Sequence, residues 1–112
     1  MTTRTDLGVV LVENSVLKSI AANAALEVEG VVGIWTEPWY RRWMPSRVSA
    51  VEVEISDQEI RLSLALTAEF GVNLSELAVR VQDRVRDRME QMTQLIVVEV
   101  KVSIQDIKPK RS

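Results

Sequence analysis

The stretch from Ile60 to Phe70 places an apolar residue at every second position, and this alternation constrains the fold more than any other feature of the sequence. A period of two is typical of a β-strand with one apolar face. Such a strand needs a sheet that is covered on one side only. The predicted inward side chains are Ile60, Leu62, Leu64, Leu66, Ala68 and Phe70, and the outward ones are Arg61, Ser63, Ala65, Thr67 and Glu69.

Three other segments have strand patterns. Residues 8–12 form a short apolar run, and residues 48–55 and 96–104 alternate. The turn Asp57-Gln58-Glu59 joins the second of these segments to the 60–70 strand, which predicts a hairpin with one buried face. In the last segment the inward side chains are expected at Ile96, Val98, Val100, Val102 and Ile104, and the outward ones at Val97, Glu99, Lys101 and Ser103.

Two segments have the spacing of amphipathic helices. The first spans about residues 16–29, with Asn14 or Ser15 as its expected N-cap and Gly30 in the C-terminal capping position. The second spans about residues 74–92. Asn73 precedes it, and Glu76 lies three residues later, which is the spacing of a capping box.

The order of these elements is β-α-β-β-α-β. Because every strand and helix has a single apolar face, two layers are expected: a four-stranded, mostly antiparallel sheet with both helices on one face. The predicted class is therefore α+β, a ferredoxin-like sandwich. We expect one domain over residues 1–107, with an aromatic and basic connection over residues 33–47 and a basic tail over residues 108–112.

Composition argues against several classes of function. The chain of 112 residues has no His and no Cys, so it lacks a side chain that titrates near neutral pH and a thiol nucleophile. We expect no enzyme, no metal, no cofactor and no small-molecule substrate. The net charge of -2 supplies no basic surface for nucleic acid, and the outward positions of the 60–70 strand carry no ring on which a base could stack.

Carboxylate pairs exist at Glu52 and Glu54 and at Glu27 and Glu29. The first pair is better explained as part of a solvated sheet face, with one of its members opposite Arg61. The N-terminus lacks the apolar run of a signal peptide, and no segment is apolar enough to span a membrane. We therefore expect a cytoplasmic protein.

Four of the five aromatic residues lie within nine positions of the connection, beside two arginines. Tryptophan and tyrosine join an apolar body to a polar tip and are enriched where a surface meets a partner. A spacing of four between tryptophans fits a short amphipathic helix. The candidate partner-binding residues are Trp35, Trp39, Tyr40, Arg41, Arg42 and Trp43.

The sequence leaves three alternatives for the surface on which these rings dock. The first is the domain itself, with Trp35 under the first helix and the other rings against the small residues Ser63, Ala65 and Thr67 on the open sheet face. The second is a protein partner or another copy of the chain. The third is an anionic membrane surface, with tryptophans at the headgroup level and arginines on the lipid charge.

The sequence resembles a bacterial family, the alkaline shock protein 23 and general stress protein 24 family of envelope stress response proteins. The resemblance covers about 100 residues. Gln94 stands where the family usually has Gly, and the Trp-rich connection replaces a segment that is variable in relatives. The matching pieces are Ala25-Leu26-Glu27-Val28-Glu29-Gly30-Val31, Glu69-Phe70-Gly71-Val72-Asn73-Leu74, Val81-Gln82, Met92-Thr93 and Val98-Glu99-Val100-Lys101-Val102.

The resemblance implies a non-enzymatic cytosolic protein that is linked to envelope stress or homeostasis and is sometimes held at the membrane by partner proteins. It supplies no catalytic residue. Two hypotheses follow: an interaction or scaffold protein that acts through a protein partner or self-association, and a peripheral membrane-surface binder that acts through the Trp and Arg loop.

Overall fold

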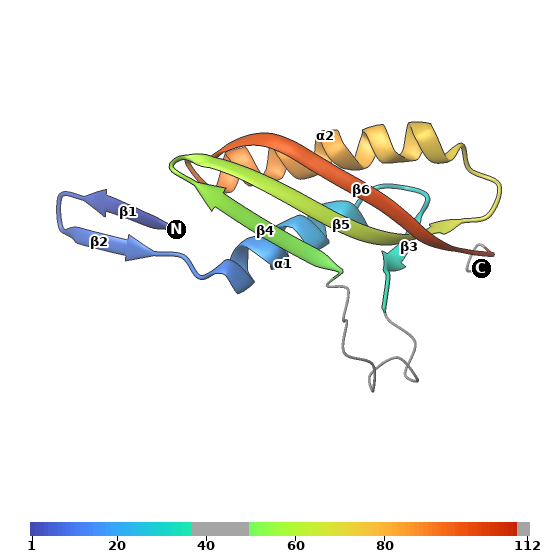
Figure 1. Cartoon of the computed structure of the whole chain (residues 1–112), viewed down its shortest axis with the longest axis horizontal. Helices are drawn as coiled ribbons and strands as arrows, with labels where there is room; N and C mark the ends of the chain where they lie inside the picture. The colour runs from blue at the N-terminus through green and yellow to red at the C-terminus, as the bar shows by residue number, and fades with distance from the viewer. Residues whose placement is uncertain (37–49, 110–112) are drawn as a thin grey trace.

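The computed structural model describes residues 1–36 and 50–109 (Figure 1). In chain order the elements are β1 (Thr2–Thr5), β2 (Gly8–Leu11), α1 (Asn14–Leu26), β3 (Val31–Ile34), β4 (Val51–Ser56), β5 (Glu59–Glu69), α2 (Leu74–Met92) and β6 (Ile96–Lys108). Strands β1 and β2 form a separate two-stranded sheet, and β3, β4, β5 and β6 form a four-stranded sheet.

Strand β5 is the centre of the four-stranded sheet. Along one edge it pairs antiparallel with β4 over its first half and with β3 over its second half. Along the other edge it pairs in parallel with β6 over its whole length. Strands β3 and β4 therefore follow one another along the same edge of β5, and the described sheet places β5 between that edge and β6.

Both helices lie on one face of this sheet, behind it in the view of Figure 1. The core forms between that face and the helices and contains the five predicted inward residues of β5 from Ile60 to Ala68. The α+β class, the two layers and the mostly antiparallel four-stranded sheet are confirmed. The core side chains contributed by the helices include Leu17, Ala21, Ala24, Ala25, Leu77, Val81, Val85 and Met89.

The strand predicted at residues 8–12 does not belong to the main sheet. It pairs as β2 with β1, which the sequence pattern did not predict. The strand that replaces it in the four-stranded sheet is β3, which contains Val31 and Gly33 and pairs with β5. Its four residues lie partly within the segment that was predicted to be a connection. The short segment gives too few alternate positions for a strand signal, and glycine, present here as Gly33, is depleted in strands.

The two helices differ in how well their ends were predicted. Helix α1 begins at Asn14, slightly earlier than expected, with Glu13 in the N-cap position and no side-chain cap. It ends at Leu26, so Gly30 lies beyond the helix, at φ 102°, where an added Cβ would meet Leu77 at 3.1 Å. Helix α2 has its predicted bounds, and Asn73 accepts a hydrogen bond from the backbone N–H of Glu76 at 3.1 Å, which confirms this cap.

The alternation predicted for β6 was wrong at its start. A bulge shifts the register between β5 and β6, so that Val97 pairs with Ile60 and packs against the core. Ile96 and Val98 are exposed instead. An extra residue in one strand reverses the faces of the residues before it. Phe70, which was predicted to point inward, is 76% exposed because the chain turns away after β5.

The end of β6 lies further along the chain than the pattern indicated. The strand continues to Lys108, whose carbonyl oxygen accepts a hydrogen bond from the N–H of Phe70 at 2.8 Å. A second bulge between Ile104 and Asp106 keeps Ile107 opposite Ala68. Residues 110–112 of the predicted tail lie outside the described residues.

Candidate binding surface on the open face of the sheet

The face of the sheet opposite the helices carries the outward side chains of β5 and its neighbours. Strand register fixes three rows across it, each centred on one residue of β5. The rows are Glu54, Arg61 and Glu99; then Glu52, Ser63 and Lys101; then Ala65 and Ser103. Charge is concentrated in the first two rows, and the third row is made of small side chains. The face therefore has a charged half and a small-residue half.

Trp35 and Ala50, which lie on either side of the undescribed residues 37–49, are both bonded to a single residue of β5. The N–H of Trp35 donates to the carbonyl oxygen of Ala65 at 2.9 Å, and the N–H of Ala65 donates to the carbonyl oxygen of Ala50 at 2.8 Å. In an unbroken antiparallel edge one residue would make both bonds. Here Trp35 makes one of these bonds to Ala65 and Ala50 makes the other. The residues between Trp35 and Ala50 are therefore an insertion at one position of the strand pairing.

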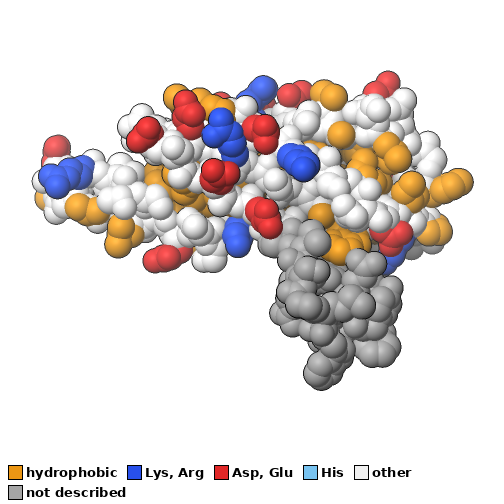
Figure 2. Space-filling model, viewed as in Figure 1, with side chains coloured by type: hydrophobic (Ala, Val, Ile, Leu, Met, Phe, Trp, Pro, Cys, Tyr) orange, Lys and Arg blue, Asp and Glu red, His pale blue; other side chains and the backbone are white. Residues whose placement is uncertain are grey.

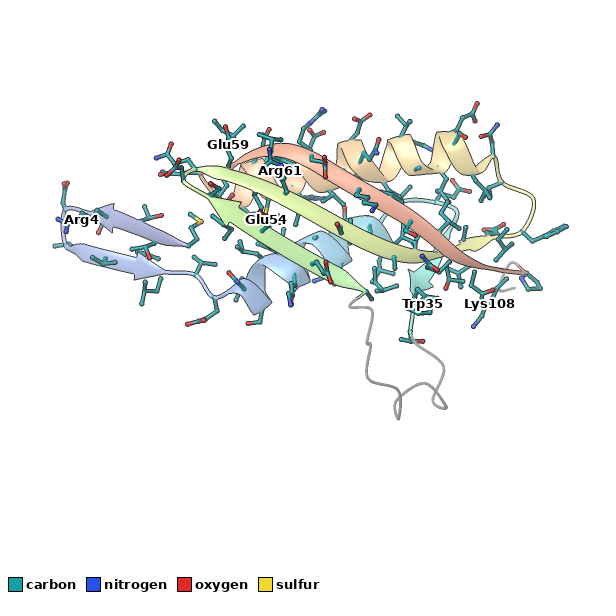
Figure 3. The ribbon with its side chains drawn as sticks, in the orientation of Figure 1. Arg4, Trp35, Glu54, Glu59, Arg61 and Lys108 are labelled. Carbon is teal, nitrogen blue, oxygen red and sulfur yellow. The ribbon has the colours of Figure 1, made fainter. Side chains whose placement is uncertain are left out.

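Trp35 follows β3 and is half-buried. Its neighbour Ile34 packs against the core, so strand alternation places Trp35 on the opposite, open face, beside Ala65. The expectation that Trp35 lies under the first helix was wrong. Figure 3 shows Trp35 beyond the end of β3, where the described chain leaves the sheet. The other predicted site residues, Trp39, Tyr40, Arg41, Arg42 and Trp43, lie outside the described residues.

A hollow of about 230 Å³ spans the second and third rows and includes Ala65, to which Trp35 is bonded. Ala65 and Thr67, two of the three small residues predicted to accept the rings, are 5% and 7% exposed. Ser63 is half-buried. Sequence reasoning missed Gln105, because the second bulge in β6 changes which residues lie on this face. The hollow is lined by Glu52, Ser63, Leu64, Ala65, Lys101, Ser103 and Gln105.

The charged half is continuous with a second hollow of about 380 Å³ that reaches the start of α1. Glu54 lies opposite Arg61 in the register of the hairpin, as expected, and Glu99 lies opposite Arg61 in the register of β6. Figure 2 shows side chains of both charge signs over this part of the face. Lys18 of α1 also lines the hollow. Mixed charge of this kind can orient a partner through polar contacts.

Glu27 lies at the C-terminal end of α1 and joins the two helices. Its carboxylate accepts hydrogen bonds from Arg84 at 2.8 Å and from Arg88 at 2.9 Å. These two bonds, with that from Arg84 the larger cause, hold the pKa of Glu27 below its ordinary value. Glu27 is one of the carboxylates noted in the sequence, and its role in the structure is to link the two helices.

Within residues 1–36 and 50–109, no three His, Cys, Asp or Glu side chains gather closely enough to hold a metal ion. In the same part of the chain, neither helix has the length and hydropathy needed to cross a bilayer.

The fold and this face together define a small α+β protein with one sheet face covered by helices and the other open. The chain belongs to the alkaline shock protein 23 family, which has a cell envelope-related function and whose model matches residues 2–109. This match confirms the resemblance seen in the sequence. The function of the chain is thus related to the cell envelope.

Relatives and solved structures extend this result. The protein YqhY of Bacillus subtilis (strain 168) is 30% identical over 104 residues, which cover 89% of this chain and 77% of that protein. YloU of the same organism is 23% identical over 111 residues, covering 94% and 92%. A copper form of the MamM CTD aligns with a TM-score of 0.55 and 12% identity, covering 86% of this chain and 99% of that one. The last likeness concerns the fold alone.

Proposed function

We propose that this protein is a non-enzymatic binding protein of the cell envelope that holds a protein partner, or another copy of itself, on the open face of its sheet. The aromatic segment, defined as Trp35 to Trp43, supplies the contact. The observation that carries the proposal is that Trp35, where this segment begins, is bonded to the backbone of Ala65, a residue that also lines a hollow on the face that the helices leave open.

The energetics of the rings support binding. Ordering nine residues costs on the order of 10 to 15 kcal/mol. Burying four rings at about 150 Å² each contributes roughly 15 kcal/mol. Since these two terms nearly cancel, a docked state of the segment depends on nearly all of the rings being covered. A partner that lies across Trp35 and the neighbouring hollow would cover them together with the open sheet face.

The chemistry of the side chains supports a role without catalysis. The sequence has no His and no Cys, which removes the side chains most often used as a general base or a nucleophile near neutral pH. The mixed charges of Glu54, Arg61 and Glu99 fit a surface that orients a partner. We place the protein in the cytoplasm, held at the membrane through its partner.

The test is a double variant, Trp39→Ala with Trp43→Ala. We expect it to lose the association that the wild-type protein shows in sedimentation equilibrium or in pull-downs from cells, because it removes two rings of the contact. Phe70→Ala is the matched control, since Phe70 is also an exposed aromatic residue but lies beyond the end of β5. The proposal fails if the double variant associates as strongly as the control.

A second function is a direct contact with an anionic membrane surface. Arg41 and Arg42 lie between the tryptophans in the sequence, and this combination is typical of segments that rest on lipid headgroups. The family's cell envelope-related function supports the same idea. Co-sedimentation with phosphatidylglycerol vesicles should weaken as salt is added and in an Arg41→Gln, Arg42→Gln variant. Recovery of all protein in the supernatant at low salt would remove this alternative.

A further inference from the structure

The hairpin of β1 and β2 projects from one end of the domain (Figure 1). It joins the rest of the molecule at its base, where Met1 and Val12 pack against the core. Every residue of β2 is exposed, although the strand is apolar. The exposed fractions are 55% for Val9, 48% for Val10 and 69% for Leu11. An apolar strand at a free edge is a template for pairing with another strand.

Hydrogen bonds at the base of the hairpin show which residues of β2 face that free edge. The amino group of Met1 donates to the carbonyl oxygen of Val12 at 2.8 Å, and the N–H of Val12 donates to the carbonyl oxygen of Met1 at 2.8 Å. In an antiparallel pair such residues alternate along the strand with residues whose N–H and C=O point the other way. Val10 therefore faces β1, where its register partner is Thr3, and Val9 and Leu11 turn their backbone groups to the free edge.

This arrangement is self-complementary about Val10. If β2 of a second copy lies antiparallel along the free edge with Val10 opposite Val10, then Val9 of each copy lies opposite Leu11 of the other. Val9 and Leu11 are the residues whose N–H and C=O groups are directed outward, so each facing pair can exchange two bonds. We propose that two copies of this chain associate through β2, forming a four-stranded sheet around a two-fold axis at Val10.

The charge and the area of the strand fit a second copy as the occupant. No residue from Gly8 to Val12 is charged, so the strand meets itself without repulsion. Arg4 lies beside Val9 in the hairpin register, and in the paired form it is two strands away from Leu11 of the second copy. A two-stranded sheet alone is marginally stable, and pairing would double it. A pair of strands of this length buries less than the roughly 1,200 Å² of a stable interface, so the dimer is a weak one.

The outer edge of β6 is less suited to receive this strand. Strand β6 has its outer edge beside α2, and two side chains of that helix already use its backbone. Gln82 donates to the carbonyl oxygen of Val100 at 3.1 Å, and Glu90 accepts from the N–H of Val97 at 3.0 Å. Side-chain hydrogen bonds of this kind occupy backbone groups of the edge strand and so hinder its pairing with another strand. Pairing between two β2 strands needs no such bonds to be broken.

The chain has no cysteine, so a single introduced thiol can report the geometry. Opposite residues of the Val10 type lie about 4.5 Å apart between Cα atoms, within the range of a disulfide. We expect Val10→Cys to form covalent dimers under mild oxidation. Thr3→Cys is the control, because its Cα would be about 14 Å from its counterpart, three strand spacings away. Equal cross-linking of both variants, or none with Val10→Cys, overturns the proposal.

Two further experiments separate this inference from other outcomes. The Val10→Cys dimer should persist when Trp39→Ala and Trp43→Ala are added, so failure of the proposed function and failure of this pairing can be told apart. Without any thiol, Val9→Lys combined with Leu11→Lys should weaken the dimer by more than about tenfold in sedimentation equilibrium, since like charges would then face each other. Val9→Lys combined with Leu11→Glu should restore it, because each Lys would then face a Glu. Equal dimerisation by both pairs contradicts the register.

Discussion

Glu27 shows how one surface residue can link two elements. It ends α1, and its two arginine partners lie one turn apart on α2, at positions 84 and 88. A carboxylate that accepts bonds from two guanidinium groups is stabilised in its charged form. The three side chains are only partly covered, with exposed fractions of 41% to 44%. The link therefore orients the two helices, and its contribution to stability is screened by water.

The pKa of Glu27 should respond to its partners. NMR titration is expected to give a value below 4.5 in the wild-type protein. Because the folded-state pKa is lowered, the stabilisation is present above the unfolded-state pKa and is lost as pH falls through the folded-state value. An Arg84→Gln, Arg88→Gln variant should return the pKa toward 4.5. An unchanged titration curve in that variant would rule out the two arginines as the cause.

At the scale of elements, α2 and β5 were predictable because their signals are local and repeated. Asn73 and Glu76 mark the start of α2, and the apolar stripe of the helix recurs along its 19 residues. Strand β5 alternates over 11 residues. Both were predicted with the correct faces, apart from their last apolar residues, Met92 of the helix and Phe70 after the strand, which are 65% and 76% exposed.

Strand β3 and the bulges of β6 could not be predicted, because they depend on pairing with β5. Ile96, Val97 and Val98 are all apolar, so the sequence alone does not say which of them points inward. Pairing of Val97 with the buried Ile60 makes Val97 the inward residue. Strand β3 has four residues and gains its place only through bonds to β5. Of the candidate site, the sequence identified Trp35 and the small residues of β5, but not the face on which Trp35 lies.

The interior face of α2 gives a test of the packing. Met89 is 0% exposed in the core, and Met92 on the same helix is 65% exposed. We expect Met89→Ala to lower the free energy of unfolding by about 2 to 5 kcal/mol, because it removes buried methylene groups and leaves a cavity. Met92→Ala should change it by less than about 0.5 kcal/mol. Urea denaturation measures both, and similar effects in the two variants would contradict the core described for α2.

At the scale of the whole molecule, the two candidate contacts occupy different parts of the protein. Trp35, where the aromatic segment begins, directly follows β3, and the hairpin projects beyond the start of α1 (Figure 1). Use of one contact leaves the other free. A family member with a cell envelope-related function could in this way pair with a second copy at one end while its sheet face holds a different partner.

The bonds of Trp35 and Ala50 to Ala65 predict that the domain folds without the native sequence of residues 37–49. Replacing residues 37–49 by a Gly-Ser linker of equal length should change the free energy of unfolding by less than about 1 kcal/mol, because the loop closes over the same number of residues. Association through the segment should be lost. Thermal and urea unfolding followed by circular dichroism measure the first effect. A large loss of stability would mean that the rings dock on their own domain.

The shared hydrogen bonds of Ala65 also have a consequence for how such a chain can vary. Trp35 and Ala50 are held by the backbone of β5, and these bonds do not depend on the side chains between them. Changes in length or composition there add little to the cost of closing the loop. The sheet can thus serve as a constant frame for an exchangeable cassette. A peptide tag or a fluorescent label placed in residues 37–49 should be carried without a shift in strand register.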